Sequence, residues 1–382
     1  MILSKYPYVV QKEILDNMEY SDLFLLSFVS KNMKKLITSS QMNRFQSMRF
    51  IRYRCDKTKQ PYVYVHFNNN DQRLMRVASR REKIMRIVEH NETENDYFLL
   101  NVSGTMIAFR FTREGRNERI QYPEKYYNPY PVASYQPSEK ESVIKPIHNY
   151  FLAFFGSSME YQWHGMDLTG SSYYIPFIPQ LQKLVFCVRM YISQDFADME
   201  NLEKIFSSSP VFKSIQMSAS RTTKTFHPES KFYQAESINI TQCVHTFPAI
   251  LRHFKGRQVF IKSIGRETSG DLIEFVNRWK SGEAFQKLEF LKFEVLRDDL
   301  LHNGIFNEVG AKYIEATKQP PTHILPKVHN WYYQIENTDP ITSHAYVVRQ
   351  SDNCVASILI LERTLFFGVW DKTEEDFLKM IN

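Results

Sequence analysis

The chain has 382 residues, of which 43% are hydrophobic and 14% aromatic, and its formal net charge is +6. This composition supplies enough apolar surface for a sizeable core and excludes an intrinsically disordered protein. The length leaves room for a short module followed by one large domain or two medium ones.

No segment has the length and apolar character of a membrane-spanning helix, and the N-terminus lacks the basic start and apolar run of a signal peptide. We therefore expect a soluble, intracellular protein with no membrane contact. The four cysteines lie far apart without a C-x-x-C pair, so they predict neither a disulfide framework nor a zinc site. They are Cys55, Cys187, Cys243 and Cys354.

Positive charge is concentrated between Lys31 and Arg86, where 15 Lys or Arg stand against three acids. Because aromatic residues are interleaved with these cations, one interpretation is a nucleic-acid-binding surface over residues 31–86. The other is a solvated hairpin and helix whose basic side chains cover apolar surface with their stems. The chain has no RNP, KH or zinc-finger signature, which favours the second interpretation.

In chain order, the first predicted element is a helix with Pro7 at its first position and Val10, Ile14 and Met18 forming one apolar stripe. Ser21 or Asp22 can cap a second helix and Ser30 a third, which divides residues 23–37 into two short helices. The hydrophobic residues of this stretch surround most of the helical wheel, and a module below about 40 residues cannot bury them all. The surplus face therefore contacts either a partner or the rest of the chain.

The order of residue types over residues 3–40 resembles an F-box, the helical module that docks a substrate receptor onto a cullin-RING (SCF-type) ubiquitin ligase. Tyr6-Pro7 stands where the family has Leu-Pro, and Ile14-Leu15 where its first helix has paired hydrophobic residues. Asp22-Leu23, Leu26-Ser27 and Ser30-Lys31 match later steps of its pattern. Ser30 replaces the usual Cys, and Met33 stands where many members have Trp.

The resemblance implies a surface for a Skp-type adaptor, with apolar residues at its centre and polar ones at its rim. Its expected members are Tyr6, Pro7, Val10, Ile14, Leu15, Met18, Leu23, Leu26, Ser30 and Lys31.

The middle region, residues 46–178, is predicted to connect short strands with helices. The expected elements begin with a strand at Tyr62–Phe67, a helix at Arg76–Val88 and a hairpin of 97–102 with 105–111 around Ser103-Gly104. Residues 122–137, which hold four prolines, are expected to form an extended connector. A helix should follow, because Ser138 and Glu141 form a capping box.

From Leu181 a loose pattern of apolar spacing recurs, with its second hydrophobic positions at Leu184, Ile215, Ile238, Val259 and Leu288. These intervals are near the period of leucine-rich repeats, so we expect irregular strand-helix units and a parallel sheet. An ordinary α/β sheet with coincidental spacing is the alternative. The expected helices are Met199–Ser207, Val244–Phe254 and Leu272–Lys280.

The C-terminal stretch is predicted to be antiparallel, with strands at 330–336, 344–350, 355–361 and 365–370, a turn at Ser351-Asp352-Asn353 and a short helix from Thr373. Its ending, Val-Val-Arg-Gln-Ser-Asp followed by Phe-Phe-Gly-Val-Trp, resembles the F-box-associated domain of type 2 of the large nematode F-box family. The resemblance implies a target-binding region after the F-box. Candidate target surfaces are the sheet edge, the loops after the repeat strands and residues 218–230.

The expected fold is thus α+β or α/β, with a three-helix F-box (1–45), a connecting α+β region (46–178) and a repeat-like α/β domain ending in antiparallel strands (179–382). No Walker, G-x-G-x-x-G, G-x-S-x-G or H-E-x-x-H pattern occurs. Asp298-Asp299 and Glu374-Glu375-Asp376 suit turns and a helix start better than catalysis. His245 and His253 lie eight residues apart on an expected helix, which is more typical of a helix surface than of a metal site. We therefore expect a non-enzymatic receptor without cofactor or metal.

Overall fold

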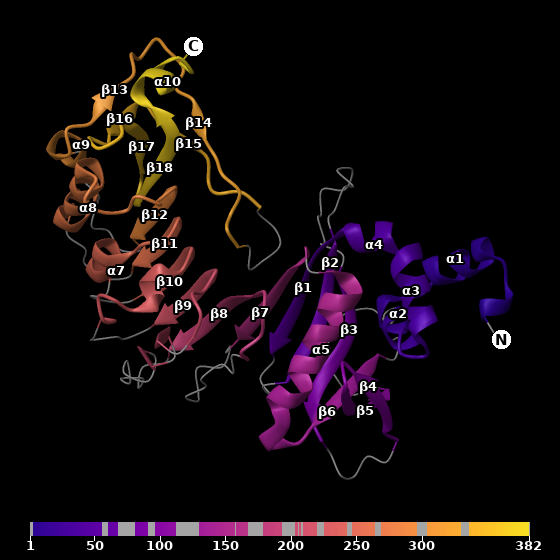
Figure 1. Ribbon diagram of the computed structural model, residues 1–382. Helices are drawn as coiled ribbons and strands as arrows, with labels where there is room; N and C mark the ends of the chain where they lie inside the picture. Colours follow the sequence, from indigo (N-terminus) through magenta and orange to yellow (C-terminus); the bar gives the residue numbers. More distant parts are fainter. Residues whose placement is uncertain are drawn as a thin grey trace. The chain divides into compact units, whose positions relative to one another are not determined.

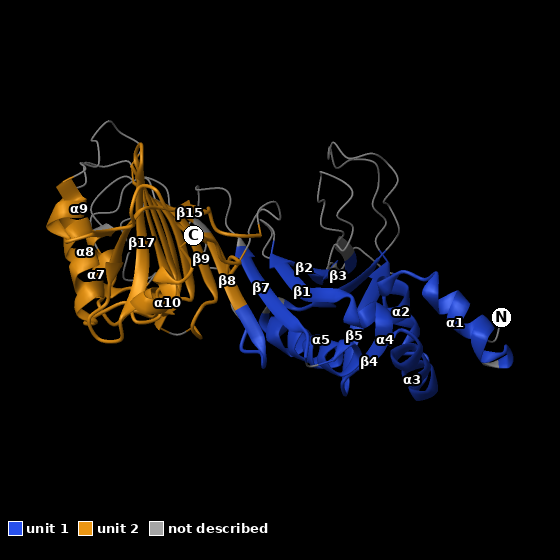
Figure 2. Cartoon of the chain, turned by 90° about the horizontal axis from the view of Figure 1, so that it is seen from above, with its two compact units in different colours: residues 1–166, 176–185 blue, residues 167–175, 186–382 orange. Residues whose placement is uncertain are grey.

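The computed structural model describes residues 3–55, 60–67, 81–90, 96–111, 130–156, 158–166, 179–192, 203–204, 206–207, 209–219, 225–242, 247–263, 269–295, 304–329 and 336–381. The chain forms two compact units (Figure 2). Unit 1 comprises residues 1–166 and 176–185, and unit 2 comprises 167–175 and 186–382. Within the described residues no helix is both long and apolar enough to cross a membrane.

The N-terminal helices of unit 1 follow the predicted order, with differences at their caps. Pro7 is the N-cap of the first helix and not its first residue, and Glu19 precedes the second helix where Ser21 or Asp22 was expected. Ser30 caps the third as predicted, because its side chain accepts from the amide of Met33. The helices are η1 (Leu3–Lys5), α1 (Tyr8–Asp16), α2 (Tyr20–Leu26), α3 (Lys31–Ser40) and α4 (Met42–Gln46).

A mixed sheet follows these helices in unit 1, with strand order β7-β1-β2-β3-β6-β5-β4 (Figure 1). The pairs β1–β7 and β3–β6 are parallel, and the others for which register is given are antiparallel. The strands are β1 (Met48–Cys55), β2 (Pro61–Phe67), β3 (Arg81–Glu89), β4 (Phe98–Val102), β5 (Thr105–Phe111), β6 (Pro131–Tyr135) and β7 (Glu160–Met166).

Helix α5 (Lys140–Phe155), preceded by η2 (Pro137–Glu139), packs on one face of this sheet. Tyr53 of β1 stacks with Trp163 of β7 and contacts Phe151 of α5, and both Tyr53 and Phe151 are fully buried. The hydroxyl of Tyr53 lies 3.0 Å from Nδ1 of His148, whose Nε2 lies 2.8 Å from the carbonyl oxygen of Gln182. The core of unit 1 thus lies between α5 and the sheet.

Three predictions for the middle region were wrong in part. The expected helix at Arg76–Val88 is the strand β3 from Arg81 onward, since its residues pair with β2 and β6; residues 76–80 lie outside the described residues. The expected connector at 122–137 contains the buried strand β6, while residues 122–129 are not described. The helix after Ser138 is present, but its N-cap is Glu139 and no side chain caps it. The predicted strand β2 and hairpin β4–β5 are confirmed.

Five parallel strands in chain order form the first part of unit 2, and helices lie on one side of them (Figure 1). The predicted alternation of strands and helices is confirmed by α7 and α8, and residues 203–204 and 206–207 are helical within the expected Met199–Ser207. The elements are β8 (Leu184–Ile192, in unit 2 from residue 186), β9 (Ser214–Ala219), η3 (Lys231–Gln234), β10 (Ser237–Gln242), α7 (Phe247–His253), β11 (Gln258–Ser263), α8 (Ser269–Ser281), β12 (Phe290–Val295) and α9 (Gly304–Glu308).

The register corrects part of the predicted repeat. Ile215, Ile238 and Val259 are register neighbours, as the spacing required. The positions beside them in the outer strands are Val188 and Leu291, whereas the repeat had assigned Leu184 and Leu288. The parallel order is therefore confirmed, but the units are less regular than the sequence pattern indicated.

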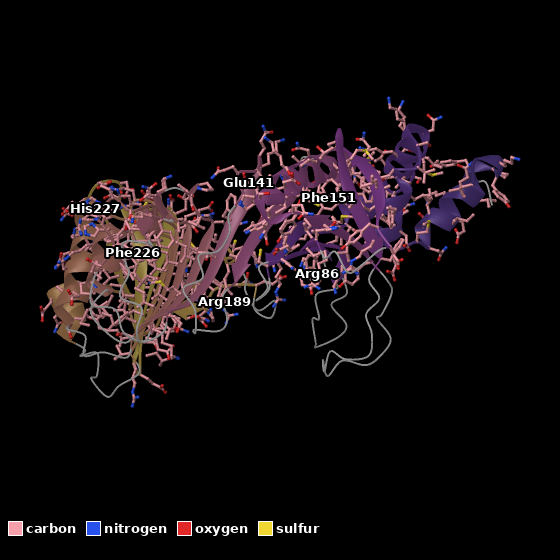
Figure 3. The ribbon with its side chains drawn as sticks, turned by 90° about the horizontal axis from the view of Figure 1, so that it is seen from below. Arg86, Glu141, Phe151, Arg189, Phe226 and His227 are labelled. Carbon is pink, nitrogen blue, oxygen red and sulfur yellow. The ribbon has the colours of Figure 1, made fainter. Side chains whose placement is uncertain are left out.

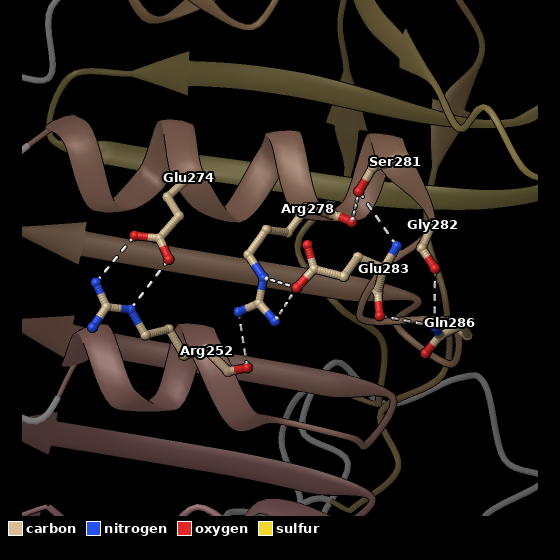
Figure 4. Close-up of polar contacts among 7 residues, drawn as sticks. All are labelled: Arg252, Glu274, Arg278, Ser281, Gly282, Glu283 and Gln286. Atoms are coloured by element: carbon tan, nitrogen blue, oxygen red, sulfur yellow. Dashed lines mark hydrogen bonds and ion pairs between the residues drawn. The ribbon is translucent and has the colours of Figure 1, made fainter.

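The two helices on this sheet are joined by charged side chains (Figure 4). The guanidinium of Arg252 binds both carboxylate oxygens of Glu274 at 3.2 and 3.1 Å. Arg278 donates to the carbonyl oxygen of Arg252 at 3.1 Å and to Glu283 at 3.0 Å. Below them the buried ring of Trp279 contacts Phe367 of β18, so the apolar side of α8 faces the sheet.

The predicted antiparallel ending is confirmed for its last three strands, with order β12-β18-β17-β16-β13. Asn353 has φ +58°, which the turn at 351–353 requires, and the side chain of Thr373 caps the last helix. Residues 330–335 of the expected first strand lie outside the described residues. The elements are β13 (Lys312–Tyr313), β14 (Thr322–His323), β15 (Ile341–Thr342), β16 (Ala345–Val348), β17 (Cys354–Leu361), β18 (Thr364–Thr373) and α10 (Glu374–Leu378).

Candidate functional site

The first residues of helix α1, together with Tyr6 just before it, present an exposed apolar surface. The exposed fraction is 41% for Tyr6, 54% for Tyr8, 76% for Val9 and 40% for Val10. On an ordinary protein surface exposed hydrophobic residues are scattered singly, whereas here four of them lie within five consecutive residues. We call Tyr6, Tyr8, Val9 and Val10 the α1 surface.

The expected adaptor-contacting residues divide into three groups by exposure. Leu15 and Leu23 have no exposed surface, so in this chain they hold the helices together from inside. The exposed members are Tyr6, Pro7, Val10, Ser30 and Lys31, and the half-buried members are Ile14, Met18 and Leu26.

Arg44 of α4 anchors the C-terminal end of α1, a role that the sequence did not reveal. Its guanidinium donates to the carbonyl oxygens of Leu15, Asp16 and Met18 at 3.0, 3.2 and 3.0 Å. The same group lies 4.5 Å from the ring centroid of Tyr20. A cation at these carbonyls opposes the negative end of the helix dipole. It also gives the carbonyl oxygen of Leu15, which already accepts from the amide of Met18, a second donor.

Asp16 completes this anchor from the α1 side. It accepts from Lys12 at 2.5 Å and from Gln41 at 2.7 Å. The hydrogen bond from Lys12 is the main reason why the pKa of Asp16 lies below its usual value, and the bond from Gln41 acts in the same direction. Since Gln41 also binds Arg44 at 2.9 Å, one polar network fixes α1 to α4.

The α2 helix packs on α5, about 120 residues further along the chain. Phe24 contacts Phe151 at 5.1 Å between ring centroids, and Phe28 stacks on Tyr150 at 4.3 Å. Figure 3 labels Phe151. The hydroxyl groups of Ser27 and Tyr150 lie 2.6 Å apart and are buried. The surplus hydrophobic face of α2 is therefore covered largely by this chain, while the α1 surface is not.

Lys34 of α3 covers the same contact from outside, with its Nζ 4.0 Å from the ring centroid of Tyr150. Burial lowers the pKa of Lys34 and raises that of Tyr150. Each shift disfavours a charged form in a partly apolar place. This Lys therefore serves packing within unit 1, although it belongs to the basic stretch.

Other cations of the 31–86 stretch also lie against the chain itself. Arg52 is 2% exposed and binds the side-chain oxygen of Gln162 at 2.8 and 2.6 Å. Lys83 and Arg86 lie over the ring of Tyr62 at 4.8 and 4.5 Å, and Figure 3 labels Arg86. These contacts agree with the interpretation in which basic side chains cover apolar and aromatic surface.

The acidic residues and histidines that the sequence analysis considered for catalysis do not form a catalytic site among the described residues. Glu374–Asp376 form the first turn of α10, where carboxylates favour the helix dipole. His253 ends α7, and burial together with neighbouring cations lowers its pKa. His245, Asp298-Asp299 and Cys243 lie outside the described residues.

Comparison with known families identifies an F-box domain at residues 7–45. A domain of this kind implies a substrate-adaptor role in SCF-type ubiquitin ligases through binding of a Skp-type adaptor, and F-box proteins are generally non-catalytic. The match contains most of the α1 surface and the Arg44 anchor, but not α5. Neither the curated proteins nor the solved structures give a match to this chain.

Proposed function

We propose that this F-box protein is the substrate-recognition subunit of an SCF-type cullin-RING ligase, which binds a Skp-type adaptor through α1 and a target protein through its C-terminal region. The observation that carries the proposal is the exposed apolar α1 surface inside the F-box match. Such a subunit acts inside the cell and supplies no chemistry of its own, since holding the target near the ubiquitin carrier provides proximity.

In this proposal the predicted site residues have two roles. Tyr6, Pro7 and Val10, with Tyr8 and Val9 beside them, form the apolar contact. Ile14, Met18 and Leu26 continue it at lower exposure, and Ser30 with Lys31 forms a polar rim. Leu15 and Leu23 support the surface from below, so Leu15→Asp would unfold the helices and would not report on binding alone.

The test is co-expression with a Skp-type adaptor followed by size-exclusion chromatography at low and high salt. The double variant Val9→Asp/Val10→Asp places two charges on the contact and should abolish the complex, because unpaired charges in an apolar interface are strongly unfavourable. Leu99→Asp is the matched control, since Leu99 is 64% exposed on β4 of the same unit. Its complex should persist.

The salt series separates this proposal from the nucleic-acid alternative. An apolar adaptor interface should withstand high salt, whereas binding to nucleic acid through the 31–86 cations would weaken steeply. A wild-type chain that is folded but elutes without adaptor would refute the receptor assignment. Equal loss of adaptor in Leu99→Asp and in the double variant would refute the α1 surface.

A further inference from the structure

The sheet of unit 2 has two chemically different faces. The register aligns Val188, Ile215, Ile238, Val259 and Leu291 on the side of α7 and α8, and all five are buried. Alternate residues point to the opposite side, because side chains alternate along a strand. Over β9, β10 and β11 that side carries mainly polar residues: Ser214, Gln216 and Ser218 of β9, Ser237, Asn239 and Thr241 of β10, and Gln258, Phe260 and Lys262 of β11. At β12 it becomes apolar, because Phe290, in register with Gln258, is buried with Ile341 and Phe366, and Phe260 packs against this cluster.

An extended segment of the same chain crosses part of this polar face. Its described parts are residues 322–329, which begin with β14, and 336–342, which end with β15, and we call these two parts together the arm (Figure 1). Its two described sides pair as a hairpin, with the amide of Thr338 donating to the carbonyl oxygen of Leu325 at 2.7 Å. Nε2 of His323 lies 3.0 Å from the carbonyl oxygen of Val369 of β18, which fixes the base of the arm.

Gln258 shows how the polar face holds extended backbone. Its side chain has no exposed surface, donates to the carbonyl oxygen of Pro326 at 2.9 Å and accepts from the amide of Val328 at 2.9 Å. One amide side chain thus satisfies a donor and an acceptor of the arm's main chain. Ser214 and Ser237, aligned with Gln258 across the sheet, are buried too.

The next two rows of the same face remain partly open. Asn239 and Phe260 are aligned in one row, and Thr241 and Lys262 in the next. All four are half-buried, whereas the alternate residues of these strands are buried beneath the helices. Another amide side chain, that of Asn239, therefore lies beside the arm on surface that the described residues leave partly accessible.

Three lysines lie at the border of arm and open rows, and one of them, Lys262, binds Glu294 at 2.7 Å. Lys292 binds Asp339 of the arm at 3.1 Å. Lys327, with its Nζ 5.9 Å from the ring centroid of Phe260, interacts with the same Asp339 and with the like charge of Lys292. Burial and Lys292 lower the pKa of Lys327, while Asp339 raises it. Among the described residues, the two cations thus share one carboxylate.

The geometry points to these open rows as the site for an extended acidic segment of the target protein, which lies beside the arm. Asn239 would bind its main chain as Gln258 binds the arm, and an acidic side chain would supply the second anion for Lys292 and Lys327. This inference rests on the proposed receptor function, because it assigns the surface that the target contacts. The arm itself shows that this face can bind extended backbone, because Gln258 holds the main chain of Pro326 and Val328.

The probe is a phage-displayed library of random decapeptides selected on the immobilised full-length chain. We expect the enriched peptides to contain Asp or Glu, and a fluorescein-labelled winner to bind in an anisotropy titration. Lys327→Gln and Asn239→Ala should each weaken its binding about tenfold, the size expected for one charge-assisted or buried hydrogen bond. Lys287→Gln, at an exposed Lys of the turn before β12, should leave it unchanged.

Adaptor binding of the same samples is measured by co-purification, so that the two proposals fail separately. Loss of the adaptor complex in the wild type would refute the receptor function whatever the peptides do. The inference itself is overturned if no peptide is enriched, if the enriched peptides lack acids, or if Lys327→Gln and Asn239→Ala bind as the wild type does. Thermal unfolding of each variant shows that a weaker signal reflects a changed surface and not unfolded protein.

Discussion

The hydroxyl groups of Ser27 and Tyr150 meet at 2.6 Å in the interior of unit 1. This contact joins α2 of the F-box to α5, which lies beyond the matched residues. Around it, Phe45 of α4 packs on Phe154 and Phe155 of the same helix at 5.4 and 5.1 Å. The F-box of this chain therefore shares its core with the region that follows it.

A double-mutant cycle should measure this coupling. Ser27→Ala leaves the buried hydroxyl of Tyr150 without its acceptor and should destabilise unit 1 by about 1–2 kcal/mol. Tyr150→Phe should cost less, about 0.5–1.5 kcal/mol, because the hydroxyl of Ser27 still donates to the carbonyl oxygen of Phe24. The double variant should lose less than the sum, with an interaction energy of about 0.5–1.5 kcal/mol, measured by urea unfolding. Additive losses would show that the two hydroxyls are not coupled.

A fragment that ends at residue 47 should fail to fold on its own. Without α5 it exposes the aromatic faces of Tyr20, Phe24 and Phe45, which unit 1 buries, and a module of this size has little other core. Far-ultraviolet circular dichroism should show helix content well below that expected for α1–α4. Extending the fragment to residue 185, the end of unit 1, should restore the signal. A cooperative thermal transition of the short fragment would contradict the shared core.

Replacement of Arg44 by Met should release α1 from the other helices. The variant removes donors from three carbonyl oxygens at the end of α1, and we expect a loss of about 2–4 kcal/mol in stability for such a partly buried, charged anchor. Adaptor binding should weaken because the α1 surface loses its fixed position. Lys35→Met is the control, since Lys35 is exposed on α3. Similar effects of the two substitutions would argue against the anchor.

Local chemistry was readable from the sequence where it involves neighbours in the chain. Ser30 caps its helix as predicted, because a cap needs only an oxygen three residues before an amide. The short helix predicted from Thr373 is present too, and the side chain of Thr373 caps it in the same way. The strand β3 was missed because its apolar residues also fit a helical period, and only pairing with β2 and β6 decides between the two.

The candidate site shows the same limit. Spacing indicated an apolar stripe from Val10 to Met18. It could not show that Val9 is exposed and Leu15 buried, because the burial of a residue on α1 depends on how α3 and α4 pack against that helix. Tyr150 and Gln258 were not singled out at all. Their partners, Ser27 and Val328, lie 123 and 70 residues away in sequence, and no local pattern encodes a contact at that separation.

Gln258→Leu should detach the arm without unfolding the sheet. The substitution removes both hydrogen bonds to the arm and leaves the carbonyl of Pro326 and the amide of Val328 unpaired. Amide hydrogen exchange of residues 322–329 should accelerate at least tenfold, corresponding to about 1.4 kcal/mol of local stability. Gln286→Leu is the control, because Gln286 is exposed in the turn before β12. Unchanged exchange in the arm would show that Gln258 does not hold it.

Stability should fall as the pH is lowered through 6.5. Burial lowers the pKa of His148 and of His323, although a backbone acceptor opposes this effect at each. Each therefore binds its proton at a lower pH in the folded protein than in the unfolded chain, whose histidines have the ordinary pKa of 6.5. The folded state accordingly loses stability as the pH falls from 6.5 toward the lowered pKa. We expect the free energy of unfolding to be lower at pH 5.5 than at pH 7.5, by on the order of 1 kcal/mol, as measured by urea unfolding.

Two substitutions assign this pH dependence to one histidine. His323→Gln, which keeps a donor for the carbonyl oxygen of Val369, should remove part of the loss between the two pH values, because glutamine does not bind a proton in this range. Asn307→Gln should leave the loss unchanged, since Asn307 is exposed on α9 and neither side chain binds a proton in this range. The same loss in the wild type and in His323→Gln would show that protonation of His323 does not contribute.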